Sequence, residues 1–154
     1  MPYFLEYITF WWYPKVVLSD LSNKILILKS ISDSVLIRDL KEFLKQEQVI
    51  DVVKLVRFIS KNIGSKFSYE NLSDTLGIKV YLIKKYLKLL EEIFIIRFLH
   101  PFYTDKKREL STKSKVYFLD FWVMNYYLKN FDKEDFDGKD VEMFVYNQLL
   151  FNLS

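Results

Sequence analysis

The sequence has no cysteine, which excludes disulfide bonds, thiolate metal sites and cysteine nucleophiles and is typical of a reducing compartment. Its one histidine, His100, cannot form a two-histidine metal site and leaves little scope for Ser-His-Asp chemistry. The three glycines, Gly64, Gly77 and Gly138, lie far apart, so they cannot build a phosphate-binding glycine-rich loop or a dinucleotide-binding fingerprint. We therefore expect a non-enzymatic chain with no cofactor and no metal site.

Long uncharged apolar stretches are also missing. No run of 18 apolar residues without a charge is present, so no membrane-spanning helix is predicted. The aromatic-rich residues 1–17 contain Glu6, lack a basic beginning and lack a small-residue cleavage site, which argues against a signal peptide. We expect a cytoplasmic protein with no membrane contact.

The composition that is present favours a globular fold. The 154 residues are 51% hydrophobic and 18% aromatic, which argues against intrinsic disorder and suffices for one domain with a substantial core. Charge is distributed unevenly: residues 79–115 contain 10 Lys and Arg against 4 Asp and Glu, a net +6. Residues 1–78 carry a net +1 and residues 116–154 a net −4. A local positive field of this kind attracts phosphate groups or another acidic surface.

Apolar residues at three- and four-residue steps predict a helix within residues 20–48 and a second over 51–63. Asp51 is the expected N-cap of the second helix, and Gly64 is expected to end it.

The next segment has the pattern of a helix-turn-helix. Ser68 is a good N-cap for a helix over 69–76, Gly77 permits a sharp turn, and Ile78 is expected to fill it. A third helix is predicted over 79–92. Two helices joined by a short turn containing glycine are typical of this motif.

After the third helix the pattern of apolar residues changes from that of a helix to that of a strand. Residues 93–103 are rich in β-branched and aromatic side chains and predict a strand, residues 104–114 a polar basic tip, and residues 115–120 the returning strand. A basic hairpin directly after a helix-turn-helix is a wing. Residues 121–130 and 141–153 read as two further helices.

The predicted fold class is therefore α+β and mostly α-helical, a winged helix-turn-helix with flanking helices. We expect three parts: an N-terminal aromatic segment with helices, the winged-helix domain, and C-terminal helices, over residues 1–50, 51–120 and 121–154.

The third helix presents two different faces on a helical wheel. Its apolar side chains fall on one side, namely Leu82, Ile83, Tyr86, Leu87, Leu89 and Leu90. Within an arc of about 100° on the other side lie Tyr81, Lys84, Lys85 and Lys88. The tip of the wing adds Lys106, Lys107, Arg108 and Lys113. We interpret these eight residues as a candidate site for double-stranded DNA.

The helix face lacks Arg, Asn and Gln, the side chains that usually read base edges. Lysine and tyrosine hold the phosphate backbone better than they read sequence, so weak sequence specificity is expected. Three phosphate contacts predict a slope of log affinity against log salt of about −2.7, and the wing could bring it towards −6. The alternative is a solvated lysine-rich surface on an interaction or oligomerisation scaffold, without nucleic acid.

Four stretches of the chain also resemble a known family. They are residues 6–17, 32–45, 63–120, which include NLSDTLGIKVYLIKKYLKLLEE, and 141–153. Together they resemble the C-terminal region, a domain of unknown function, of archaeal and bacterial AAA+ ATPases. Trp11-Trp12 stands where that family has Gly-Gly, and Lys79 where a serine often caps the third helix.

The resemblance implies partners and boundaries. In that family an ATPase module precedes a winged helix, and a domain similar to PD-(D/E)XK nucleases follows it. The resemblance implies that residues 1–50 link to a missing ATPase module and that residues 121–154 begin a truncated nuclease-like domain, with Glu142 at the matching acidic position. It implies neither ATP hydrolysis nor cleavage by this chain, and it gives an AAA+ ATPase module, in cis or in trans, or a second copy of the chain as partner.

Two other groups of charges have competing interpretations. An acidic run could bind Mg²⁺ or Ca²⁺, but its spacing does not match an EF-hand loop and a solvated linker is the preferred reading; it contains Asp132, Glu134, Asp135, Asp137, Asp140 and Glu142. Arg38-Asp39 is either a structural ion pair or a contact to an ATPase partner.

Overall fold

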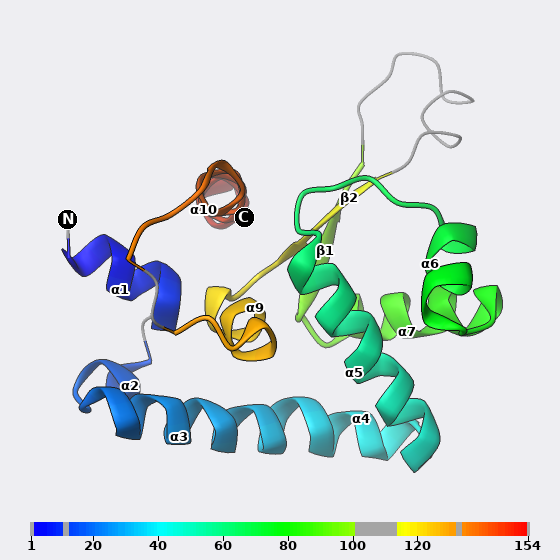
Figure 1. Ribbon diagram of the computed structural model, residues 1–154, viewed down its shortest axis with the longest axis horizontal. Helices are drawn as coiled ribbons and strands as arrows, with labels where there is room; N and C mark the ends of the chain where they lie inside the picture. The colour runs from blue at the N-terminus through cyan, green and yellow to red at the C-terminus, as the bar shows by residue number, and fades with distance from the viewer. Residues whose placement is uncertain (1, 11–12, 101–113, 132–133, 154) are drawn as a thin grey trace.

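The computed structural model describes residues 2–10, 13–100, 114–131 and 134–153 (Figure 1). It is a mostly helical α+β structure with one two-stranded antiparallel sheet, as predicted. The tip of the predicted wing, with Lys106, Lys107, Arg108 and Lys113, lies outside the described residues.

The N-terminal third consists of helices. They are α1 (Pro2–Phe10), α2 (Pro14–Val17), α3 (Leu21–Ile31), the π-helical η1 (Ser32–Ile37) and α4 (Arg38–Phe43). Figure 1 shows α3, η1 and α4 joined in one long rod along the lower edge of the molecule. Asp20 caps this rod, because its carboxylate accepts the backbone N–H of Asn23 at 2.9 Å.

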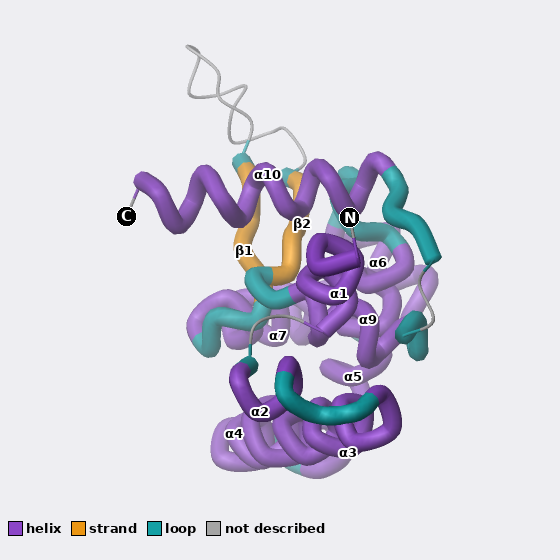
Figure 2. Tube along the Cα trace, turned by 90° about the vertical axis from the view of Figure 1, so that its left-hand side faces the viewer, coloured by secondary structure: helices purple, strands orange, loops and turns teal. Residues whose placement is uncertain are grey.

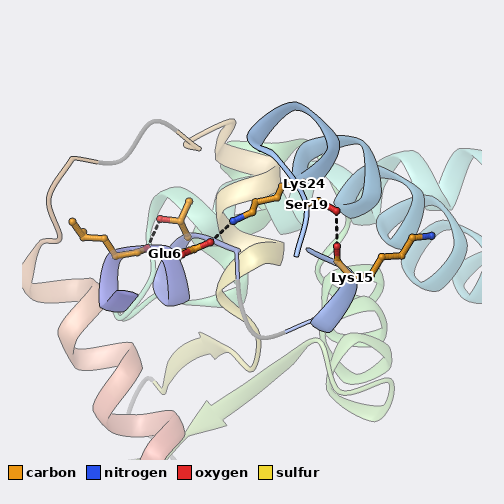
Figure 3. Close-up of polar contacts among 6 residues, drawn as sticks. Glu6, Lys15, Ser19 and Lys24 are labelled. Carbon is orange, nitrogen blue, oxygen red and sulfur yellow. Dashed lines mark hydrogen bonds and ion pairs between the residues drawn. The ribbon is translucent and has the colours of Figure 1, made fainter. Parts of the chain in front are cut away.

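A partly buried ion pair ties α1 to this rod (Figure 3). The Lys24 ammonium donates to the Glu6 carboxylate and lies 5.2 Å from the centre of the Phe10 ring. Lys24 is thereby paired where it is removed from water, which a buried charge requires. In the same view Ser19 donates to the backbone carbonyl of Lys15 at 2.7 Å.

The central segment contains α5 (Gln46–Lys61), α6 (Tyr69–Leu76), α7 (Val80–Glu92), β1 (Ile96–Leu99) and β2 (Lys115–Phe118). The predicted N-cap at Asp51 is wrong, since α5 begins five residues earlier and Lys45 is its N-cap. The Gln48 side chain accepts the Lys45 backbone N–H at 3.1 Å, and Val49 is buried in the core two residues before Asp51. Because Val49 is buried in the core, the helix begins before Asp51.

The first strand is shorter than predicted because Ile93, Phe94 and Ile95 form the turn that ends α7. Phe94 has a left-handed backbone with φ of +59°. Its N–H donates to the carbonyl of Glu91 at 3.1 Å, and the N–H of Ile95 donates to that of Leu90 at 2.9 Å. These two bonds form a Schellman motif, in which glycine is the usual left-handed residue.

The C-terminal helices α9 (Phe121–Leu128) and α10 (Gly138–Leu153) complete the fold. In Figure 2, α10 crosses the two strands, and one buried asparagine in each of these two helices anchors it to its neighbours. Asn147 of α10 donates to the carbonyls of Phe118 and Leu119 at 3.1 and 3.0 Å. Asn125 of α9 donates to the carbonyls of Ile8 and Thr9, at the end of α1, at 2.7 and 3.1 Å.

One hydrophobic core draws on all three predicted parts of the chain. α9 packs on α1 and α5, and α6 packs on α7. The largest fully buried side chains include Tyr86, Tyr117, Phe118 and Phe121. This core sets the orientation of α7 relative to the sheet.

Candidate nucleic-acid interface

The turn between α6 and α7 forms as the sequence predicts. The Ser68 hydroxyl accepts the backbone N–H of Asn71 at 3.2 Å and caps α6. Gly77 ends this helix with φ of +68°, and its N–H donates to the carbonyl of Ser73 at 2.9 Å. Ile78 is buried beneath the turn. Lys79, at the N-cap of α7, makes no capping bond with its side chain, as expected for a lysine in that place.

The two faces of α7 are divided as the helical wheel predicts. Ile83, Tyr86, Leu87 and Leu90 are buried, whereas Leu82 and Leu89 are half-buried. Exposed on the opposite side are Tyr81, Lys84, Lys85 and Lys88. The structure thus brings four of the eight predicted site residues onto one outward face.

Two of the three exposed lysines on α7 have neighbours that interact with their ammonium groups. The Lys84 ammonium lies 5.0 Å from the centre of the Tyr69 ring, at the start of α6, in cation–π geometry. The Lys88 ammonium lies 3.7 Å from the Glu92 carboxylate one turn further along α7. Because this second pair is exposed, it contributes little to stability, but it partly neutralises Lys88. Sequence reasoning did not include Tyr69 in the site, although its place at the first turn of the preceding helix could have suggested it.

The sheet behind α7 is an antiparallel pair in which Ile96 faces Phe118 and Leu99 faces Lys115. Lys66, in the link between α5 and α6, forms an isolated antiparallel bridge with Lys115. β2 therefore pairs with β1 along one edge and with the α5–α6 link, at Lys66, along its other edge. At the end of the hairpin, His100 contacts the Ser114 hydroxyl at 2.7 Å and stacks on the Phe98 ring.

A polar cluster that the sequence did not predict lies where β2 meets α10. The Glu142 carboxylate accepts hydrogen bonds from the Lys115 ammonium and, at 2.8 Å, from the Tyr117 hydroxyl. The bond from Lys115 lowers the pKa of Glu142, and that from Tyr117 adds to this effect. Burial, followed by the bond to Glu142, raises the pKa of Tyr117 well above its usual value, so this hydroxyl remains a donor.

The acidic segment that leads into α10 forms hydrogen bonds with the first backbone N–H groups of that helix. The Asp137 carboxylate accepts the backbone N–H groups of Lys139 and Asp140 at 2.8 and 3.0 Å. Among the residues described, no group of three or more acidic or histidine side chains is arranged to hold a metal ion. Asp132 lies outside the described residues.

Comparison with known proteins gives one match. Residues 1–134 match a family described as "Domain of unknown function (DUF8612)", and the match ends before α10. No curated protein and no solved structure matches the chain. Within the described ranges, no helix combines the length and apolar character that crossing a membrane would require.

Proposed function

The chain belongs to the DUF8612 family, and we propose that it is a winged-helix module that binds duplex DNA through backbone phosphates with little sequence specificity. The observation that carries this proposal is the placement of Tyr81, Lys84, Lys85 and Lys88 on one exposed face of α7. Thirteen residues of helix are about 20 Å long, and an α-helix fits the major groove of B-form DNA.

The order of elements supports the winged-helix part of the proposal. A winged helix has three helices followed by a hairpin, and a short extended segment after its first helix pairs with the second hairpin strand. Here α5, the link at Lys66, α6, α7, β1 and β2 follow in that order. The bridge from Lys66 to Lys115 provides the corresponding pairing.

The chemistry of the α7 face supports backbone binding over base reading. Ammonium groups pair with phosphate as point charges, whereas recognition of bases relies on bidentate Arg, Asn or Gln. Lys88 already has a carboxylate partner in Glu92, so α7 by itself provides between two and three phosphate contacts. The salt slope from α7 is then between about −1.8 and −2.7, before any contribution from the wing.

The resemblance described above adds two elements to the proposal. The module is not itself an enzyme, and its protein partner is an AAA+ ATPase module in cis or in trans. One observation favours an interaction scaffold as the second candidate function: Val141, Val145 and Leu149 are exposed at four-residue steps along α10. Apolar side chains gathered on a surface are typical of protein contacts.

A salt titration tests the DNA proposal. The chain is titrated into a fluorescein-labelled duplex of about two helical turns, and anisotropy is measured between about 50 and 200 mM salt. With three contacts the affinity falls about 40-fold across this range. In the triple variant K84A/K85A/K88A we expect weaker binding and a flatter slope.

A charge-matched control removes three exposed lysines, two from the α3–α4 rod and one from the N-cap of α5. The variant K29A/K41A/K45A has the same net charge as the α7 variant. It should bind almost as wild type if α7 makes the contacts. Absence of saturable binding at low salt, or equal losses in both variants, would reject the proposal and leave the scaffold function.

A further inference from the structure

One face of the sheet carries positive charge at the end where the two strands lead into the tip of the hairpin. Residues directly opposite each other in an antiparallel pair point to the same side, so Lys66 and Lys115 share a face. Like charges opposite each other destabilise a sheet unless an anion lies between or beside them. In this structure the anion is internal, the carboxylate of Glu142 on α10.

The carboxylate of Glu142 occupies a cradle with the properties of an oxyanion site. The Lys115 ammonium supplies a charged donor, and the hydroxyl of the buried Tyr117 supplies a second donor at 2.8 Å. The third wall is Gly64, where an added Cβ would lie 3.0 Å from the second carboxylate oxygen, Oε2. Glycine, with φ of +69°, thus leaves room for an oxygen where any side chain would crowd it.

The cradle is accessible from solvent. The Lys115 side chain is 31% exposed and that of Glu142 is 42% exposed, so the ion pair lies at the surface. Exposed ion pairs contribute little to stability, and other anions compete with them readily. The Glu142 side chain can also leave without α10, because buried Met143 and the bonds from Asn147 hold that helix on the sheet independently.

We propose that the cradle of Gly64, Lys115 and Tyr117 is a second phosphate-binding site for the nucleic-acid backbone, and that the Glu142 side chain closes it as an internal competitor. This inference rests on the proposed function and deepens it. Lys115 directly follows the segment that carries the basic wing residues, and Lys66 beside it is exposed. A backbone phosphate can enter this site only after Glu142 has turned away, because the carboxylate occupies the same two donors.

The competitor model makes an unusual prediction, namely that removing an acidic side chain improves binding through one identified lysine. In E142Q the charge of Lys115 is no longer neutralised, so one further counterion is released on binding. The salt slope should become steeper by about 0.9, and affinity at low salt should rise about tenfold. In the double variant E142Q/K115A both gains should vanish, while K115A by itself should bind as wild type.

Two controls keep the outcome interpretable. E42Q makes the same change of net charge on exposed Glu42 of α4, which Figure 1 shows far from α10, and it should leave the slope unchanged. E142A provides a second way to empty the cradle, because buried Met143 and the bonds from Asn147 hold α10 on the sheet without this side chain. Each variant is first checked by circular dichroism to be folded and is then titrated.

The results separate this inference from the proposed function. Wild-type binding with an unchanged slope in E142Q and E142A would reject the second site and leave DNA binding by α7 intact. An equal gain in E42Q, or a gain that survives in E142Q/K115A, would also reject it, because the effect would be one of net charge only. Absence of wild-type binding at low salt would reject both proposals at the first measurement.

Discussion

Phe94 offers a direct test of how α7 is ended. Its backbone is left-handed with φ of +59°, and the residue is 67% exposed, so the ring makes few contacts that would offset the strain. A left-handed residue with a Cβ costs about 1–2 kcal/mol, which glycine avoids. Glycine in turn loses about 0.5–1 kcal/mol through its greater freedom in the unfolded chain.

The comparison that isolates this effect is between F94A and F94G, because both variants lose the same ring. From these magnitudes F94G should be more stable than F94A by about 0.5–1 kcal/mol. For a chain of this size the difference corresponds to a Tm shift of about 1–4 °C, and it should appear in urea as a change of midpoint at constant slope.

A matched pair at Lys54, exposed within α5, should give the opposite order. There K54G should be less stable than K54A by about 1 kcal/mol, since the backbone is helical and glycine has only its entropic disadvantage. If F94A equals or exceeds F94G in stability, the left-handed conformation at Phe94 carries no cost and the reasoning is wrong.

Three further predictions follow from polar contacts. E92Q should release Lys88, steepen the salt slope of DNA binding by up to about 0.9 and change stability by less than about 0.5 kcal/mol, measured by anisotropy and urea unfolding. N125A should lower the free energy of unfolding by at least about 2 kcal/mol, because two carbonyls at the end of α1 lose their buried donor. Since Lys115 lowers the pKa of folded Glu142 below 4.5, this pair stabilises the protein above that pH and ceases to do so as acidification protonates the carboxylate. The difference in urea midpoint between wild type and E142Q should therefore be present at neutral pH and disappear in strong acid.

The two helices α6 and α7 and the turn between them could be predicted because each of their signals is local. Ser68 caps a helix that begins at the next residue, and Gly77 adopts the left-handed conformation that a turn requires. The division of α7 into a buried face and a face of lysines depends only on helical period. In such a segment, propensity, capping and burial all agree, so the sequence by itself specifies the outcome.

The ends of α5 and α7 could not be predicted in the same way. At Asp51 a good capping residue lies inside a helix, because the core buries Val49 two residues earlier and the Gln48 side chain accepts the backbone N–H of Lys45, the true N-cap. At Phe94 no residue with a left-handed preference marks the turn. The Schellman bonds form because buried Leu90 and Ile95 meet in the core, which outweighs the local preference of phenylalanine.

The cradle at Glu142 shows the limit of reading charge from a sequence. In the sequence, Lys115 belongs to the basic block of residues 79–115 and Glu142 to the acidic block of residues 116–154, so nothing indicates that the two charges pair. The fold places them in contact across 27 residues of chain and sets Gly64 against the same carboxylate. The field that a polyanion meets is therefore the sum of the lysines that remain unpaired after the protein has satisfied its own carboxylates. The positive charge available for binding is therefore smaller than the net +6 of residues 79–115, because Glu142, which lies outside that block, pairs with Lys115. Glu92, which pairs with Lys88, is already counted in the +6.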